Sequence, residues 1–234
     1  MSRMTIDTVL LEFDGVLADT SLARRAAMVS VLDEDGIALS AEEYVDACLG
    51  RTTGDAVRAL IARHGLAMDE TGLDLLTMRV DRAFSAHLTT GVVLVEGARE
   101  TVERLSTRVR LGIVSRLNRR DVEFVLALAQ LDDAFVCVVG AEDAYPAKPS
   151  PAPYLMAMRR LQGQRPVPAH AVVVALEDST VGIRSARAAQ LSCIAVGHLP
   201  AHSAMEAVAI IPSVAGIDVA SLEQLIARTG ADFA

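Results

Sequence analysis

Four acidic residues stand in two pairs where apolar runs of the sequence end. In the stretch LLEFDGVLADT, Glu12 and Asp14 lie on either side of one phenylalanine, directly after a hydrophobic run. Residues two apart in extended chain project to the same side, so we expect these two carboxylates to lie together. Glu177 and Asp178 follow another apolar run. Carboxylates gathered this densely repel one another unless a cation lies among them, and the hard ion Mg²⁺ suits oxygen ligands.

A hydroxyl and an ammonium accompany the acids. Ser115 follows the run RLGIV, and Lys148 lies in the segment AKPSP as the one lysine among 22 basic residues. Beside a divalent ion, these two groups suit the oxygens of a phosphoryl group. Each residue also has an ordinary interpretation: Ser115 and Asp178 as helix caps, the acids as solvated charges, and Lys148 as a loop charge.

The elements that would position these residues are strands of a parallel sheet. Near-continuous apolar runs of strand length cover residues 8–13, 110–115, 134–139, 171–176 and 191–196. Segments with apolar residues at helical spacing, such as NRRDVEFVLALAQ and PAPYLMAMRRLQ, lie between them. This alternation predicts an α/β, doubly wound fold with a buried parallel sheet. Ligands of such sheets bind outside the carboxyl ends of the strands, so the residues after each run should share one edge.

A long insertion follows the first predicted strand. Nearly a hundred residues separate it from the second, and helices are expected over residues 20–35, 41–48, 53–64 and 70–88. We therefore predict an inserted all-helical domain at 19–91 and a Rossmann-like core formed by 1–18 and 92–234. A last helix, SLEQLIARTG, is expected to end at Gly230.

Composition narrows the class of protein. A formal net charge of −8 and the lack of a long basic run argue against nucleic acid or an anionic membrane as partner. Three widely spaced cysteines, at 48, 137 and 193, predict reduced core thiols. The sequence shows no secretory apolar segment and no run approaching eighteen apolar residues. We expect a cytoplasmic monomer or homodimer.

Four segments in fixed order resemble a known family. EFDGVLADT, GIVSRLNRRDVE, AKPSPAPYL and VALEDSTVGIRSARAA are similar to the four motifs of the haloacid dehalogenase superfamily. The likeness is to the branch of beta-phosphoglucomutase-like and phosphoglycolate-phosphatase-like enzymes, which carry a helical cap. The resemblance implies a Rossmann-like core, Mg²⁺ and phosphoryl transfer through an acyl phosphate on the first motif's acid.

The resemblance also implies roles for single residues. Glu12 stands at the nucleophile, and Asp14 matches the general acid and base that protonates the leaving oxygen and then activates water. Ser115 matches the hydroxyl that binds the transferring phosphoryl group. Lys148 matches the lysine that neutralises nucleophile and phosphate.

The implied cofactor is Mg²⁺. Its ligands by position would be Glu12, Asp14, Glu177 and Asp178, with the backbone carbonyl of Asp14 among the ligating groups.

Four positions depart from the family pattern. Glu12 replaces the usual aspartate, and a displacement of about 1 Å can cost roughly 10²-fold in rate. Glu12 therefore either attacks from an adapted backbone, or binds metal and attacks poorly. Arg116 follows Ser115 and would add a phosphate contact or block the site. Ala152 and Gln190 are interpreted as changes at a helix start and a turn.

The expected reaction is hydrolysis of a small phosphorylated metabolite. The resemblance disfavours two other reactions: relatives that cleave phosphonates need a second lysine, which this chain lacks, and dehalogenase relatives need neither an acid at Asp14 nor the metal-binding acids. A sugar-phosphate mutase is less favoured because Arg24 stands where such enzymes usually carry histidine. The alternative class is a catalytically weakened protein that binds phosphate and Mg²⁺ or serves in regulation. Candidate contacts for a second anionic group of the substrate are Arg24, Arg51, Arg79 and Arg82, each of which could also be a solvated helix charge.

Overall fold

The chain forms two compact units. The computed structural model describes residues 5–48, 51–168, 171–199 and 205–231 of the 234-residue chain. One unit, the core, comprises Met1–Asp19 and Val93–Ala234, and the other, the helical unit, comprises Thr20–Val92. The boundaries therefore lie one residue further along the chain than the predicted ones.

The core is built on a parallel sheet. Within the described ranges its strands are β1 (Thr5–Leu11), β4 (Arg110–Val114), β5 (Phe135–Val139), β6 (Ala171–Glu177), β7 (Ser192–Val196) and β8 (Ala209–Ile211). Their order across the sheet is β5-β4-β1-β6-β7-β8, and each neighbouring pair is parallel. The predicted α/β fold with a Rossmann-type core is confirmed. Because β4, β1 and β6 are neighbours, their carboxyl ends adjoin.

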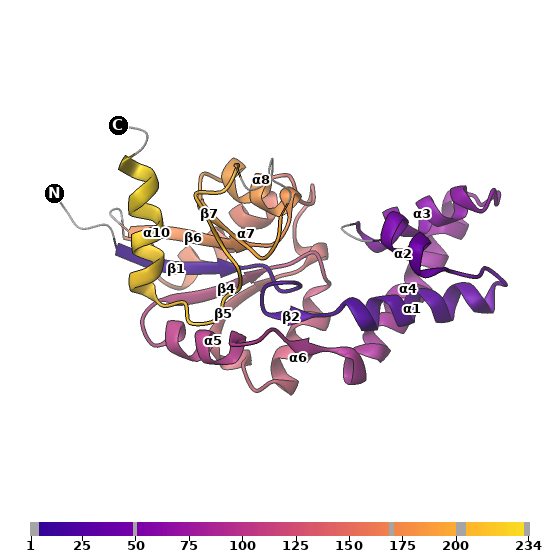
Figure 1. The fold of residues 1–234 in the computed structure, drawn as a ribbon, viewed down its shortest axis with the longest axis horizontal. Coiled ribbons are helices and arrows are strands. Elements are labelled where there is room, and N and C mark those ends of the chain that lie inside the picture. Colours follow the sequence, from indigo (N-terminus) through magenta and orange to yellow (C-terminus); the bar gives the residue numbers. More distant parts are fainter. Residues whose placement is uncertain (1–4, 49–50, 169–170, 200–204, 232–234) are drawn as a thin grey trace. The chain divides into compact units, whose positions relative to one another are not determined.

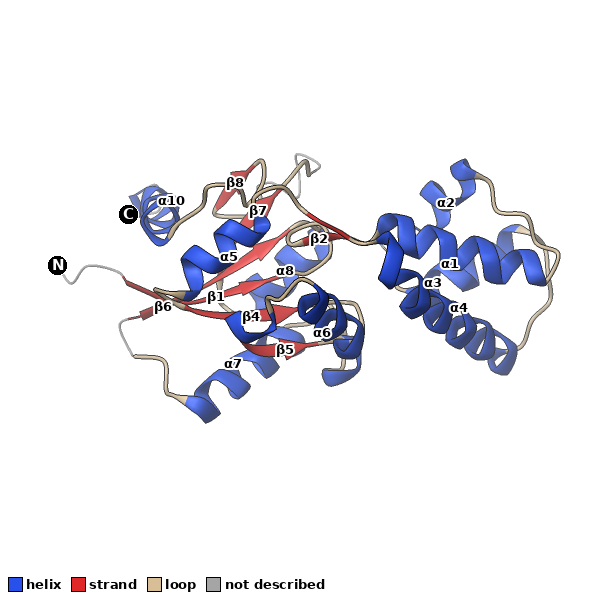
Figure 2. Ribbon diagram, turned by 90° about the horizontal axis from the view of Figure 1, so that it is seen from below, coloured by secondary structure: helices blue, strands red, loops and turns tan. Residues whose placement is uncertain are grey.

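Helices cover both faces of this sheet. The core helices are α5 (Ala98–Ser106), α6 (Arg119–Leu128), α7 (Ala152–Gln164), α8 (Thr180–Ala188) and α10 (Val219–Ala231). Figure 1 shows α7 and α8 on one side of the sheet and α5 and α6 on the other. In Figure 2, α10 lies beside the sheet near the amino-terminal end of β1, which it contacts. No described helix is long and apolar enough to cross a membrane.

Apolar side chains that alternate along the strands fill the space beneath α7 and α8. Leu10, Ala175, Cys193 and Ala195 are all fully buried there. Side chains alternate between the two faces of a strand, so their neighbours in β1, β6 and β7 supply the other face. Both faces are apolar because helices cover both, which explains the unbroken hydrophobic runs. Cys48, Cys137 and Cys193 are free and buried, as predicted.

Three details differ from the sequence-based expectations. The edge strand β8 was not predicted, because a run of only three residues carries little periodic signal. The last helix begins at Val219 and extends to Ala231, so Gly230 lies inside it and does not end it. Strand β1 ends at Leu11, which leaves Glu12 beyond the strand.

The helical unit contains α1 (Ser21–Glu34), α2 (Ala41–Cys48), α3 (Thr53–Arg63) and α4 (Glu70–Gly91), close to the predicted ranges. Helix α1 packs along α4, and α3 contacts both α2 and α4. The hydroxyl of Thr52 accepts a hydrogen bond from the backbone N–H of Asp55, and Asp69 caps α4 in the same way. At the boundary between the units, the core strands β2 (Ala18–Asp19) and β3 (Val93–Leu94) pair antiparallel.

Candidate functional site

The predicted site residues follow three neighbouring strands. Glu12 comes directly after β1, Ser115 after β4, and Asp178 after β6. The backbone N–H of Glu12 donates to the Leu176 carbonyl at 3.0 Å, so the main chain of Glu12 continues the ladder between β1 and β6. The predicted common edge, at the carboxyl ends of neighbouring parallel strands, is therefore present in the structure.

Lys148 lies at the centre of the site. Its side chain is 1% exposed, although it belongs to the loop between β5 and α7. The ammonium donates to Glu12 Oε2 at 2.7 Å, to the Val114 carbonyl at 2.7 Å and to Glu177 Oε1. It also lies 5.2 Å from the centre of the Tyr154 ring. The interpretation of Lys148 as an ordinary loop charge is wrong, because an ammonium buried this deeply is held by its counter-charges.

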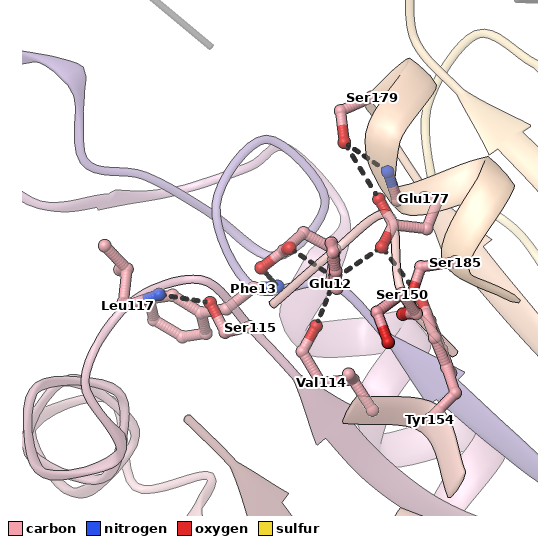
Figure 3. Close-up of polar contacts among 12 residues, drawn as sticks. Glu12, Phe13, Val114, Ser115, Leu117, Ser150, Tyr154, Glu177, Ser179 and Ser185 are labelled. Atoms are coloured by element: carbon pink, nitrogen blue, oxygen red, sulfur yellow. Dashed lines mark hydrogen bonds and ion pairs between the residues drawn. The ribbon is translucent and has the colours of Figure 1, made fainter. Parts of the chain in front are cut away.

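Glu177 points into the core. Its Oε1 accepts a second hydrogen bond, from the Tyr154 hydroxyl at 2.8 Å, and its Oε2 accepts one from the Ser179 hydroxyl at 3.3 Å (Figure 3). A Cβ at Gly182 would lie 1.9 Å from Oε2, so only glycine fits beside this carboxylate. We call Lys148, Glu12, Glu177 and Tyr154 the lysine cluster.

Glu12 is held through both carboxylate oxygens. Besides the contact of Oε2 with Lys148, Oε1 accepts a hydrogen bond from the backbone N–H of Phe13 at 2.7 Å. Burial raises the pKa of Glu12, but the charge and hydrogen bond of Lys148, with a hydrogen bond from Ser115 and the charge of Arg116, bring it below its usual value. Glu12 is therefore ionised at neutral pH.

One ammonium serves two buried carboxylates. Burial lowers the pKa of Lys148, yet the charges of Glu12 and Glu177 raise it above its usual value. For Glu177, burial and the charge of Glu12 outweigh the ammonium, and its pKa is raised. The lysine cluster thus keeps Lys148 protonated and carries an excess of acid.

Asp178 lies in different surroundings from its neighbour Glu177. A Cβ at Gly15 would lie 2.1 Å from Asp178 Oδ2, and Gly15 has φ +80°, so a glycine is needed there for space and conformation. The Oδ1 atom of Asp178 is buried and has no hydrogen-bond partner among the described residues. Burial, followed by the charges of Glu12 and Glu177, raises the pKa of Asp178 to about 8. A buried carboxyl oxygen without a partner is suited to bind a cation.

The predicted four-carboxylate metal site is not assembled. Among the described residues, no three acidic, histidine or cysteine side chains form a group able to hold a metal ion. The reason is that Glu12 and Glu177 are bound to Lys148, and Glu177 faces the core. Asp178 still fits a cation, through its unpartnered oxygen. Asp14, half-buried beside Gly15, acts on Asp178 through its charge.

The helix-cap interpretations of two residues are wrong. Helix α8 is capped by Ser179, whose hydroxyl accepts from the Gly182 N–H at 3.2 Å, and not by Asp178. Helix α6 begins after Asn118, and the buried Ser115 hydroxyl accepts instead from the Leu117 N–H at 3.2 Å. Neither Asp178 nor Ser115 therefore serves as a helix cap, and both lie at the carboxyl edge of the sheet.

The departures from the family pattern have local explanations in two cases. Helix α7 begins at Ala152, and Gln190 occupies a turn with φ 62°, as interpreted from sequence. Arg116 is half-buried, and its charge lowers the pKa of both Glu12 and Asp178.

The four candidate arginines of the helical unit lie in three kinds of surroundings. Arg24 and Arg51 line a small cavity within the unit, together with Thr52 and the apolar Met28, Val80 and Phe84. The Arg24 guanidinium lies 5.3 Å from the centre of the Phe84 ring. Arg79 instead forms ion pairs with Glu34 and Asp35, so its charge is used within the helical unit. Arg82 is exposed.

Sequence reasoning missed Tyr154 and Gly182. Tyr154 reads as one more core-facing residue of an amphipathic helix, and nothing in the spacing indicates that its hydroxyl meets Glu177. The signal for Gly182 is that a glycine in the first turn of a helix is unfavourable unless a neighbour needs the space.

Comparisons with known proteins address the family and the fold. A family model described as haloacid dehalogenase-like hydrolase matches residues 9–196. Protein CbbY of Rhodobacter capsulatus is 30% identical over 200 residues, covering 82% of this chain and 85% of that protein. Phosphoglycolate phosphatase of Pseudomonas savastanoi pv. phaseolicola is 26% identical over 195 residues, covering 81% and 69%. The crystal structure of beta-phosphoglucomutase from Clostridium difficile superposes with a TM-score of 0.77 at 15% identity, covering 97% of this chain and 100% of that one. The matched motifs and the fold together show that the chain belongs to the haloacid dehalogenase-like hydrolases.

Proposed function

We propose that this hydrolase is a Mg²⁺-dependent phosphatase that acts on a small phosphorylated metabolite. The observation that carries the proposal is the buried Lys148 ammonium between two carboxylates, at the adjoining ends of three strands. A fixed positive charge in a dry site suits the charge of a transferring phosphoryl group. The phosphatase named among the relatives supports hydrolysis of a phosphate ester.

The proposed reaction uses two acids in two steps. A carboxylate oxygen of Glu12 attacks phosphorus, the P–O bond to the metabolite breaks, and Asp14 gives a proton to the leaving oxygen. Asp14 then takes a proton from water, the water oxygen attacks phosphorus, and the bond to Glu12 breaks to release phosphate. Glu12 must leave its hydrogen bonds in the lysine cluster before it can attack. Lys148 and Ser115 would hold the oxygens of the phosphoryl group.

The proposed metal ligands are Asp178 and Asp14, joined by Glu12 only after its carboxylate has left Lys148. Support comes from the buried, unpartnered Oδ1 of Asp178 and from the raised pKa of that carboxyl group. When bound, Mg²⁺ would neutralise the acids and the phosphoryl oxygens. Glu177 is not proposed as a ligand, because its carboxylate is bonded to Lys148, Tyr154 and Ser179.

Substrate selection is proposed to involve the helical unit. Arg24 and Arg51 are the candidates for contact with a second anionic group, because both line one cavity of that unit. Arg116 is the candidate for a further phosphate contact, since its charge reaches Glu12 and Asp178. Arg79 is no longer a candidate.

A second function is favoured by the geometry of Glu12. Both oxygens of its carboxylate are engaged, by Lys148 and by the Phe13 N–H. A nucleophile held in this way attacks slowly. The corresponding function is binding of phosphate and Mg²⁺ without efficient turnover.

A phosphatase assay separates these functions. Wild type and Glu12→Gln are assayed with Mg²⁺ over a broad panel of phosphorylated metabolites. Glu103→Gln serves as a control, because it removes one acid from an exposed helical pair with Arg99. Turnover by wild type and Glu103→Gln that is lost in Glu12→Gln supports the phosphatase. Absence of turnover on the whole panel, with phosphate still bound, supports the binding function.

A further inference from the structure

The Glu12 carboxylate occupies a set of donors built for an anion. Lys148 Nζ lies 2.7 Å from Oε2, and the Phe13 N–H lies 2.7 Å from Oε1. A hydrogen bond from the Ser115 hydroxyl contributes to the low pKa of the same carboxylate. An ammonium, a backbone N–H and a hydroxyl from three separate segments therefore surround one buried negative group. Such a combination would bind the oxygens of a phosphate equally well.

The two main donors are fully used by the protein itself. An ammonium has three N–H donors, and those of Lys148 go to Glu12, Glu177 and the Val114 carbonyl. The Phe13 amide has a single N–H, which donates to Glu12 Oε1 at 2.7 Å. Any anion that takes these donors must first displace the Glu12 carboxylate.

Charge adds to this competition. Glu12 and Glu177 already place two acids around one buried ammonium. A phosphate entering beside both carboxylates would meet like charge at short range in surroundings that screen it poorly. Loss of the Glu12 charge would leave Lys148 with one acid partner, and loss of the whole carboxylate would also free the Phe13 N–H.

We propose that Glu12 is the resident anion of a phosphate site: its carboxylate holds the donors of Lys148 and Phe13, and inorganic phosphate binds by displacing it. The proposal rests on the proposed function, because it takes phosphate as the ligand of this edge of the sheet. It adds that the length of the Glu12 side chain makes the site self-inhibited. The side chain closes back on the N–H of the next residue while reaching the ammonium.

The test is a calorimetric titration of the full chain with inorganic phosphate, with and without Mg²⁺. The variants are Glu12→Ala, which opens the donors, and Glu12→Gln, which keeps the shape but removes the charge. Glu103→Ala is the matched control, because it changes the net charge equally at an exposed position. We expect Glu12→Ala to bind phosphate about tenfold or more tightly than wild type, Glu12→Gln to show a smaller gain, and Glu103→Ala to show none. Adding Lys148→Met to Glu12→Ala should abolish the gain.

Folding is checked by thermal denaturation, and Glu12→Gln carries the test if Glu12→Ala does not fold. Phosphate affinity that is unchanged or weaker in the folded Glu12 variants overturns the proposal. An equal gain in Glu103→Ala also overturns it, because the effect is then one of net charge. Turnover by wild type together with an unchanged phosphate affinity would remove the resident-anion proposal and leave the phosphatase. Tighter phosphate binding in Glu12→Ala together with no turnover by wild type on any substrate would support the resident-anion proposal and overturn the phosphatase.

Discussion

Glu177 and Asp178 are neighbours in sequence, yet they lie in opposite electrostatic situations. Glu177 belongs to the lysine cluster, where an ammonium and two hydroxyls satisfy its oxygens. Asp178 lies against Gly15 with one buried oxygen that no described residue satisfies. The comparison teaches that the protein supplies its own cation to Glu12 and Glu177 but not to Asp178, the residue for which we propose Mg²⁺.

The largest effect is expected from removing the cation of the lysine cluster. Lys148→Met leaves Glu12 and Glu177 buried without a counter-charge, and it should lower the free energy of unfolding by about 3 to 5 kcal/mol. Urea denaturation at pH 7 measures the change.

A surface pair and a double variant sharpen this result. Arg184→Ala removes the exposed ion pair with Glu206 and should have little effect. Combining Lys148→Met with Glu12→Gln should restore part of the loss, because one unpaired charge is then absent. If Lys148→Met is as mild as Arg184→Ala, the lysine cluster does not hold the acids as described.

The second prediction tests the packing behind Glu177. Gly182→Ala places a Cβ 1.9 Å from Glu177 Oε2 and should lower the free energy of unfolding by about 2 to 3 kcal/mol. Gly163→Ala is the matched control in helix α7, because nothing lies within 4 Å of its added Cβ. That variant should be neutral or stabilising by about 0.5 to 1 kcal/mol. Equal effects of the two substitutions would show that the Glu177 carboxylate does not lie against Gly182.

The third prediction concerns pH at Asp178. Its folded pKa is about 8, against an ordinary value of 3.8, so between these values the folded protein holds a proton that the unfolded chain has lost. Stability therefore falls as pH rises through this window. In metal-free protein at pH 8, Asp178→Asn should raise the free energy of unfolding by about 2 kcal/mol, with much less gain at pH 5.

Adding Mg²⁺ completes this test. Under the proposed function, Mg²⁺ stabilises wild type at pH 8 and does not stabilise Asp178→Asn, as measured by thermal denaturation with EDTA as the reference. Equal stabilisation of both proteins by Mg²⁺ would place the metal elsewhere. A constant gain at pH 5 and pH 8 would contradict the raised pKa.

The same comparison shows what the sequence could reveal. The apolar runs predicted where the strands end, because both faces of a parallel sheet are buried. The strand ends in turn predicted that Glu12, Ser115 and Asp178 share one edge of the sheet. The grouping of Glu177 with the metal-binding acids was avoidable. Successive residues of a strand point to opposite faces, so the last residue of β6 and the residue after it do not aim at the same place.

Other features had no usable signal in the sequence. The hydroxyl of Tyr154 meets Glu177 because of the rotation of α7 about its axis, which packing of the whole core determines. The engagement of both Glu12 oxygens depends on side-chain torsions and on the path of the loop that carries Lys148. That loop lies far from Glu12 in sequence, and no periodicity predicts its course.

The smallest expected change in stability comes from Tyr154, whose ring lies beside the Lys148 ammonium and whose hydroxyl donates to Glu177. Tyr154→Phe keeps the ring beside the Lys148 ammonium and removes only the hydroxyl that donates to Glu177. Glu177 retains Lys148 and Ser179, so the loss is one hydrogen bond to a charged group, about 1.5 kcal/mol of unfolding free energy in urea denaturation. Tyr145→Phe is the control, because its side chain is 93% exposed and should tolerate the change. If the two variants are equally stable, the Tyr154 hydroxyl does not help to hold Glu177, and Lys148 and Ser179 hold it without that hydroxyl. Glu12 and Glu177 would then depend on one cation, as Asp178 is proposed to do, and the two regions would differ only in the source of that cation.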